Sequence, residues 1–174
     1  MTIPSDSSAA PAPSLRRTWM AVLSRTPRAE LEAALDAALD GIDPPRFDWL
    51  RQPETGLAMV RGRVGGTGNA FNLGEATVTR ATLRLRDARS TSAHENAEAE
   101  ADAIVGVACH LGRDKRRVEL AAFADALLQM PEHHARLQVQ LIEPLAARIA
   151  EARSARRRDA ASTRVEFFTM VRGD

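Results

Sequence analysis

The chain has 174 residues, of which 44% are hydrophobic and 27% charged, a composition that excludes a largely disordered protein. Its formal net charge of +1 gives no overall basic field that would favour nucleic acid or a membrane as partner. Cys109 is the only cysteine, which excludes an intrachain disulfide framework and a cysteine-cluster metal site and fits a reducing, cytoplasmic compartment.

The N-terminal residues 1–14 are rich in Ser, Ala and Pro and lack the basic stretch and apolar core of a secretory signal. We expect them to form a disordered lead, followed by a single domain over residues 15–174. No window approaches 18 uninterrupted apolar residues, so no membrane span is predicted.

Two short amphipathic helices are predicted next, forming a helical hairpin. The first ends near Arg25, and apolar residues recur along it at spacings of three and four: Leu15, Trp19, Val22 and Leu23. Thr26 and Pro27 are typical of an N-cap and a first helical position. The second helix would start there and run to Gly41, with an apolar stripe of Leu31, Ala34, Leu35 and Ala38.

The middle of the chain changes to strand patterns. Strands are predicted over residues 47–51 and 57–64, separated by the turn-type cluster 53–56. Residues 76–86 alternate between Thr, Ala and Leu on one face and positions that include Arg80 and Arg84 on the other. Residues 88–102 are small, polar and acidic, which predicts a solvated loop insertion before a strand over residues 103–111.

Helix patterns return at Lys115. The first of these helices carries Leu120, Phe123, Ala124 and Leu127 and is ended by Pro131. The next carries Leu137, Leu141, Leu145 and Ile149, has a kink or break at Pro144 and leads into an exposed, arginine-rich run over residues 153–159. With a last strand over residues 165–171, this order predicts an α+β fold. We expect a mainly antiparallel sheet of about four to five strands, packed with the N-terminal helical hairpin and two later helices.

A glycine-rich loop flanked by arginines is the strongest candidate for binding chemistry. Its residues are Arg61, Arg63, Gly65, Gly66, Thr67 and Gly68. Glycines let successive backbone N–H groups converge on an anion and arginine supplies charge, so a polyphosphate would suit the loop. It lacks the Gly-Lys-Ser/Thr of a P-loop and the helix that either nucleotide fingerprint needs. The alternative is a glycine hairpin or bulge that joins two strands.

A four-residue sequence occurs twice, as Met59-Val60-Arg61-Gly62 and as Met170-Val171-Arg172-Gly173. Both copies end a predicted strand, so their arginines would meet if the strands were neighbours. A separation of about 111 residues with nothing repeated between is no tandem array. We interpret the repeat as coincidence and keep Arg172 as a candidate binding residue.

The remaining polar residues give no catalytic or metal-binding set. His133 and His134 would point about 100° apart on a helix, which makes a poor chelate. Cys109 and His110 would lie on opposite faces of a strand, which disfavours a nucleophile pair. Asp125, on a mostly apolar helix, is predicted to be a buried partner for arginine rather than a catalyst.

Several stretches together resemble the PhnG family, a subunit of the bacterial carbon-phosphorus lyase core complex. They cover most of residues 16–174 in the family's order: RRTWMAVL (16–23), PETGLAMVRGRVGGTGNAFNLGEATVTR (53–80), GRDKRRVELAAFADALLQ (112–129), residues 141–145 and RVEFFTMVRGD (164–174). The combination is far more specific than any one piece. The acidic segment 88–102 departs from the short glycine-containing turn that is usual in the family.

The resemblance implies a transferase subunit of phosphonate catabolism and phosphorus acquisition. In that complex ATP and an alkylphosphonate give a ribose 1-phosphonate 5-triphosphate with loss of adenine. Nucleosidase chemistry is attributed to a PhnI-type partner, and a later radical step uses an iron-sulfur cluster and S-adenosylmethionine on another subunit. The resemblance thus implies a chain that is required for the transfer, has no cofactor of its own and is not independently catalytic.

Two interpretations of the candidate residues stay open. Arg61, Arg63, Gly65, Gly66, Thr67, Gly68, Arg80 and Arg172 would bind an anion or line an interface with partners of the PhnH, PhnI and PhnJ types. The alternative is a purely structural module in which none of them touches a ligand. Obligate partners would leave apolar surface exposed on the lone chain, with Leu73, Phe168 and Met170 as candidates, and would favour self-association of the isolated chain.

Overall fold

The computed structural model describes residues 13–86 and 103–163. Its helices are α1 (Pro13–Leu23), α2 (Arg28–Ala38), α4 (Lys115–Leu128), α5 (Pro131–Leu137) and α6 (Glu143–Ser162). Its strands are β1 (Phe47–Arg63), β2 (Ala70–Leu85) and β3 (Val105–Leu111). A 3₁₀ turn, η1 (Val64–Gly66), joins β1 to β2, and a π-helical turn, η2 (Gln138–Ile142), joins α5 to α6.

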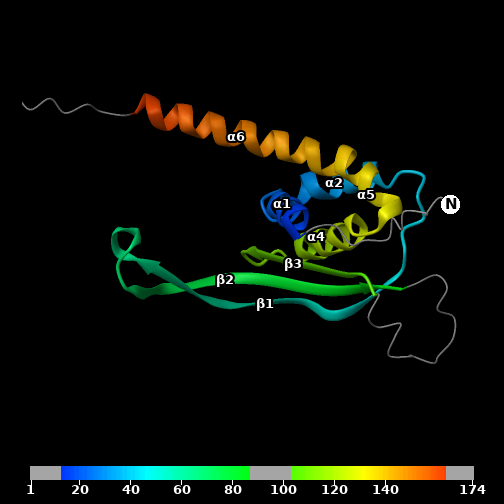
Figure 1. Cartoon of the computed structure of the whole chain (residues 1–174), viewed down its shortest axis with the longest axis horizontal. Coiled ribbons are helices and arrows are strands. Elements are labelled where there is room, and N and C mark those ends of the chain that lie inside the picture. The colour runs from blue at the N-terminus through cyan, green and yellow to red at the C-terminus, as the bar shows by residue number, and fades with distance from the viewer. Residues whose placement is uncertain (1–12, 87–102, 164–174) are drawn as a thin grey trace, which may run out of the picture.

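The strands form one antiparallel sheet in the order β1-β2-β3. Helix α4 packs against it, and α1 and α2 pack on α4, so the helices gather on one side of the sheet (Figure 1). The α+β fold class, the antiparallel sheet and the N-terminal helical hairpin are therefore confirmed. The described residues contain three strands because two of the expected segments are one strand, while the expected strand 165–171 lies outside them.

The turn predicted at residues 53–56 is wrong. Strand β1 runs straight through it, with register shifts between Arg51 and Glu54. Pro53 is tolerated because β1 is the outer strand of the described sheet, where a residue without an N–H group costs no ladder hydrogen bond. Strand β2 likewise begins at Ala70 rather than at residue 76, because it pairs with the full length of β1.

The link between the first two helices also differs from the prediction. Thr26 does not cap α2: its hydroxyl donates to the Val22 carbonyl, 2.9 Å away, and so closes the end of α1. Pro27 takes the N-cap position instead. The apolar stripes are otherwise confirmed, since Trp19 and Leu31 are among the buried residues, but Leu15 is exposed.

The C-terminal helical region is nearly continuous. Pro131 begins α5, and Pro144 stands in the first turn of α6, where proline is tolerated. The irregularity at Pro144 is the π-turn just before it, in which the Glu143 N–H bonds to the Gln138 carbonyl. Leu137, Leu141 and Leu145 are buried as predicted, and the arginine-rich run is an exposed part of α6.

Helix α4 lies unusually close to the sheet at Gly106 of β3. A Cβ added there would lie 2.0 Å from the Ala122 carbonyl oxygen and 2.8 Å from the Ala126 Cβ. Both atoms belong to α4, whose alanines on this face are buried. Only a residue without a side chain therefore lets the helix reach the sheet.

We expect Gly106→Ala to destabilise the chain by about 1–3 kcal/mol or more, because the helix backbone would have to move away from the strand. Chemical denaturation measures this. The matched control is Gly56→Ala, since a Cβ at Gly56 of β1 meets nothing within 4 Å. Equal stability of the two variants would contradict the close packing.

Asp125 of α4 is fully buried and receives hydrogen bonds from two other elements. The Arg16 guanidinium donates to both of its carboxylate oxygens, at 3.2 and 2.7 Å, and the Trp19 indole N–H donates at 2.8 Å. From β3, the Val107 backbone N–H donates at 2.9 Å. The predicted pairing of Asp125 with an arginine is confirmed, and the carboxylate ties α1, α4 and β3 together.

Replacing the carboxylate should therefore be costly. We expect Asp125→Asn to lower the free energy of unfolding by about 3–5 kcal/mol, because Arg16 loses its counter-charge and the new amide N–H₂ faces other donors. Denaturant midpoints measure the loss. Glu119→Gln serves as control, because its ion pair with Arg116 is exposed to solvent and should change stability by less than about 1 kcal/mol.

Candidate functional site

The hairpin of β1 and β2 extends beyond the rest of the sheet as a two-stranded projection, residues 57–77, which we call the arm. Strand β3 pairs with β2 only from Val78 to Arg84, so neither the third strand nor the helical layer covers the arm (Figure 1). The glycine-rich loop predicted as a binding site is its tip. The arm therefore places the candidate residues far from the hydrophobic core.

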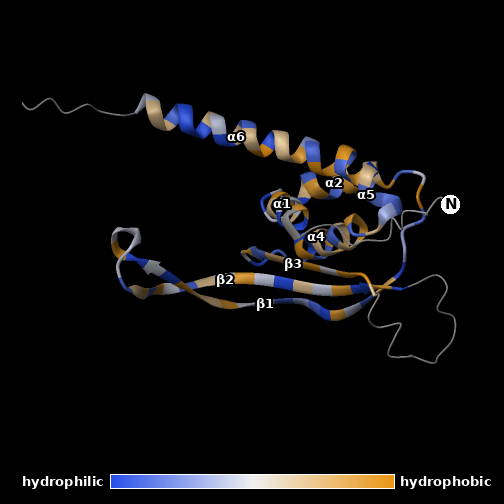
Figure 2. Ribbon diagram, in the orientation of Figure 1, coloured by the Kyte–Doolittle hydropathy of each residue, from blue (hydrophilic) through white to orange (hydrophobic). Residues whose placement is uncertain are grey.

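The arm carries large apolar side chains on both of its faces. Six of them are between 41% and 72% exposed: Leu57, Met59, Val60, Val64, Phe71 and Leu73. Figure 2 shows hydrophobic residues interspersed with polar ones along this hairpin. Several large exposed apolar side chains gathered on one element indicate an interaction site in a folded protein. The predicted exposure of Leu73 is confirmed, whereas Phe168 and Met170 lie outside the described residues.

A bulge fixes the position of Leu73. The register shifts between Val60 and Arg61, which face Gly74 and Asn72, so Leu73 is the extra residue. Gly74 has φ of +146°, a conformation that favours glycine. Opposite, a Cβ at Gly62 would lie 2.8 Å from a Leu73 methyl group, so this glycine leaves the space that Leu73 fills.

The tip is a hairpin turn, as the alternative interpretation of the glycine loop predicted. Gly65 and Gly66 have φ of +60° and +81°. The N–H groups of Thr67 and Gly68 both bond to the Val64 carbonyl, which takes up two donors that an anion cradle would need.

Arg63 is engaged at the same turn. Its guanidinium donates to the Gly68 carbonyl at 3.0 Å and so closes the tip. The turn thus satisfies much of its own polar chemistry, and both Val64 within it and Arg61 just before it are exposed.

The structure does not gather the predicted arginines in one place. Arg80 lies outside the arm, at a register position opposite Glu54, and its Nε donates to that carboxylate at 2.8 Å. This hydrogen bond is the main reason that the pKa of Glu54 lies below its ordinary value. At about 3.3 Å per residue, Arg80 is roughly 30 Å along the strand from the tip. Arg172 lies outside the described residues.

The histidine and cysteine of β3 serve packing and surface, as their alternation predicted. His110 is buried, and its ring nitrogens lie 2.6 Å from the Leu111 carbonyl and 2.9 Å from that of Asp114. Cys109 is exposed on the opposite face. Across residues 13–86 and 103–163, no cluster of three or more His, Cys, Asp or Glu is placed to hold a metal, and no helix is long and apolar enough to cross a membrane.

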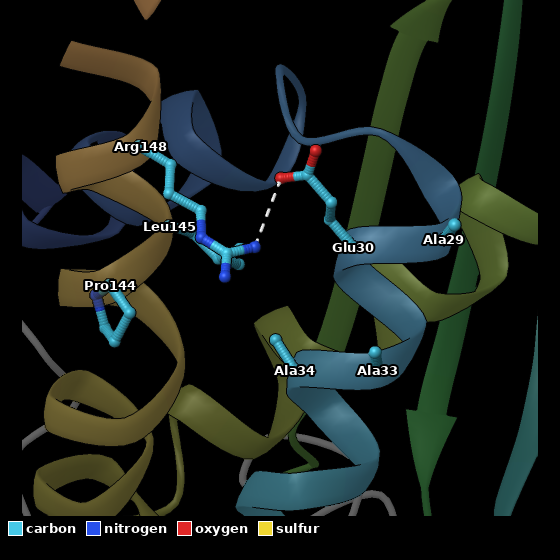
Figure 3. A pocket seen from close by; sticks show the side chains of 7 residues that line it. All are labelled: Ala29, Glu30, Ala33, Ala34, Pro144, Leu145 and Arg148. Carbon is cyan, nitrogen blue, oxygen red and sulfur yellow. Dashed lines mark ion pairs between the residues drawn. The ribbon is translucent and has the colours of Figure 1, made fainter. Parts of the chain in front are cut away.

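A pocket of about 420 Å³ lies between α2 and the start of α6 (Figure 3). It is lined by Ala29, Glu30, Ala33, Ala34, Pro144, Leu145 and Arg148. Glu30 and Arg148 face each other across it with 3.8 Å between their charged groups. This ion pair occupies the polar groups of the pocket, so the remaining lining, which is mostly alanine, leaves no nucleophile or base free for catalysis.

The fold and the arm define an α+β protein whose exposed surface suits contact with other protein chains. The family model described as "Phosphonate metabolism protein PhnG" matches residues 14–173, so this chain belongs to the PhnG family. It is 45% identical over 159 residues to a protein of Rhizobium meliloti (strain 1021), covering 91% of this chain and 90% of that protein. The relative is named "Alpha-D-ribose 1-methylphosphonate 5-triphosphate synthase subunit PhnG".

The position of the candidate loop at the end of a long projecting hairpin with apolar side chains was not predicted from the sequence. The signal was present in the alternating residues of 57–64 and 70–77, which place apolar side chains on both faces of each strand. A strand buried on one face needs apolar residues on that face only. Apolar residues on both faces with no helix to cover them therefore indicate an external partner.

Proposed function

We propose that this chain is a subunit of an enzyme complex of phosphonate metabolism that forms a ribose 1-phosphonate 5-triphosphate. The 45% identity to a relative named as a subunit of such a synthase supports the assignment. The structural observation that carries it is the arm, whose six large exposed apolar side chains require a covering surface.

The reaction exchanges two groups at one carbon atom. The bond from the ribose C1 of ATP to adenine breaks, a phosphonate oxygen forms a new bond to C1, and adenine leaves with the proton of the phosphonate. The 5-triphosphate is kept. The catalytic groups and any cofactor reside on partner chains of the PhnH, PhnI and PhnJ types, and this chain contributes to assembly and to the shape of the site that the subunits build together.

The arm is the part that enters the partner. A two-stranded ribbon has little stability of its own in water, so its apolar side chains gain most when another chain covers them. Arg61 adds a guanidinium to the exposed apolar side chains of the arm. Protein interfaces are enriched in arginine and in large apolar residues. The glycines of the tip keep its end narrow. On this basis the candidate residues of the arm line a protein interface.

The turn geometry favours the interface over direct phosphate binding at the tip. The N–H groups of Thr67 and Gly68 and the guanidinium of Arg63 already have partners within the turn. An anion would have to displace these bonds. The same observation supports the alternative function of a purely structural module, in which the arm only holds the complex together.

Removing the apolar surface of the arm should block assembly and spare the fold. We expect Leu57→Ser/Leu73→Ser to weaken binding to the partner subunits by about 30-fold or more, as for interface hot spots, with an unchanged thermal unfolding curve. Co-expression and co-purification with the partners measure this. Val139→Ser is the matched control, because Val139 is as exposed but lies on η2. Normal assembly of the double variant would refute the role of the arm.

The arm should also make the isolated chain self-associate. We expect sedimentation at increasing concentration to show oligomers of the wild type that the Leu57→Ser/Leu73→Ser variant does not form, because apolar surface without a partner drives association. A wild-type chain that stays monomeric at all concentrations would contradict this.

Arg61 distinguishes an interface from a phosphate site. We expect Arg61→Ala to weaken assembly, while turnover per assembled complex stays within about twofold of the wild type, because the arginine contacts protein. Turnover of methylphosphonate with ATP, normalised to assembled complex, is the measurement. Normal assembly with a large loss of turnover would instead place a phosphate group of the substrate at the arm.

A further inference from the structure

A groove of about 660 Å³ runs between α1 and α6, on the helical side of the molecule. Its polar rim includes four arginines, Arg17 and Arg25 from α1 and the residues just after it, and Arg153 and Arg157 from α6. Of the described residues that line it, none carries a carboxylate. The groove is therefore strongly basic in a chain whose formal net charge is only +1.

These four arginines differ from the seven described arginines that form ion pairs. Arg16, Arg28, Arg51, Arg80, Arg86, Arg116 and Arg148 all pair with a carboxylate. Within the described part of the chain, the side chains of the four groove arginines form no ion pair and no hydrogen bond. Four uncompensated positive charges around one groove repel one another, so a bound anion would relieve the repulsion.

The four arginines line the groove from two sides. Arg153 and Arg157 are four residues apart on α6, so they lie on the same face, one turn after the other. Arg17 of α1 and Arg25, which follows the end of α1 at Leu23, line the opposite wall. Each wall of the groove therefore contributes two arginines.

The floor of the groove is apolar. It includes Val22, which is buried, and Ile149, which is half-buried, together with small alanines. An apolar floor under a charged rim lowers the local polarity and strengthens contacts between guanidinium groups and an anion. The volume lies within the range of small-molecule sites in proteins.

We infer that this groove binds the polyphosphate group of a small molecule. Guanidinium forks match phosphate oxygens two at a time, and four of them suit several linked phosphates better than a single one. The choice of a triphosphate in particular rests on the proposed function, whose substrate and product both carry one. The groove is separate from the arm, so the chain would use one surface for its partners and another for phosphate.

Inorganic tripolyphosphate is the probe, titrated into the full chain at fixed ionic strength and followed by calorimetry. We expect saturable binding of one tripolyphosphate per chain. Arg17→Gln/Arg153→Gln should weaken it about tenfold or more, because two charge-assisted contacts are lost. Arg61→Gln/Arg63→Gln on the arm removes the same charge and should leave the affinity within about twofold. Arg25→Gln/Arg157→Gln gives an independent second test of the groove.

Three results would overturn the inference: no saturable binding by the wild type, unchanged binding by both groove variants, or equal affinity for sulfate at matched ionic strength. Loss of binding in the arm variant alone would move the site to the arm and equally refute the groove. The titration uses the chain without partners, so it is independent of assembly. A chain that binds tripolyphosphate but joins no complex would refute the proposed function and leave the groove standing.

Discussion

The buried carboxylate of Asp125 is the interaction on which the arrangement of the helical layer and the sheet depends. It accepts hydrogen bonds from Arg16, from Trp19 and from the backbone of Val107, so one side chain of α4 fixes both α1 and β3. Because a buried charge is costly without such partners, displacing α1 would deprive the carboxylate of the Arg16 counter-charge and the Trp19 hydrogen bond. The same helix also approaches β3 closely at Gly106. Helix α4 is therefore held on the strand both by the polar contact of Asp125 and by close packing.

This rigid centre contrasts with the two extensions of the fold. The arm and α6 both project beyond the rest of the structure, and in Figure 1 they point in the same direction. Most of α6 is exposed, with Leu145 buried at its start. The base of each extension thus packs on the core. The residues proposed to contact partners and phosphate lie on the exposed surface, where core packing does not determine the residue type.

The sequence correctly predicted the features that depend on burial in the core. The stripe around Leu31, the burial of Leu141 and the pairing of Asp125 follow from helical spacing and from the cost of burying an unpaired charge. Local signals failed where longer-range pairing outweighed them. Pro53 and Gly56 are typical turn residues, yet they lie inside β1 because the neighbouring strand pairs along its whole length.

For the candidate site, the sequence predicted which residues form the loop but not where the candidate residues lie relative to one another. Arg61, Arg63 and the glycines were predicted to form one loop, and that loop is the hairpin turn between β1 and β2. Its binding role stays a prediction. That Arg80 stands far from them follows from the register of β1 and β2, which no local pattern specifies. The basic groove was missed for a related reason, since Arg17 and Arg153 become neighbours through the packing of α6 on α1.

Most of the arm has unpaired backbone along both sides in the described structure: β1 is the outermost strand, and β2 has no second neighbour from Ala70 to Ala76. Such edges are templates for strand pairing with any extended chain. A copy synthesised in excess of its partners would therefore be a seed for aggregation and a target for proteolysis.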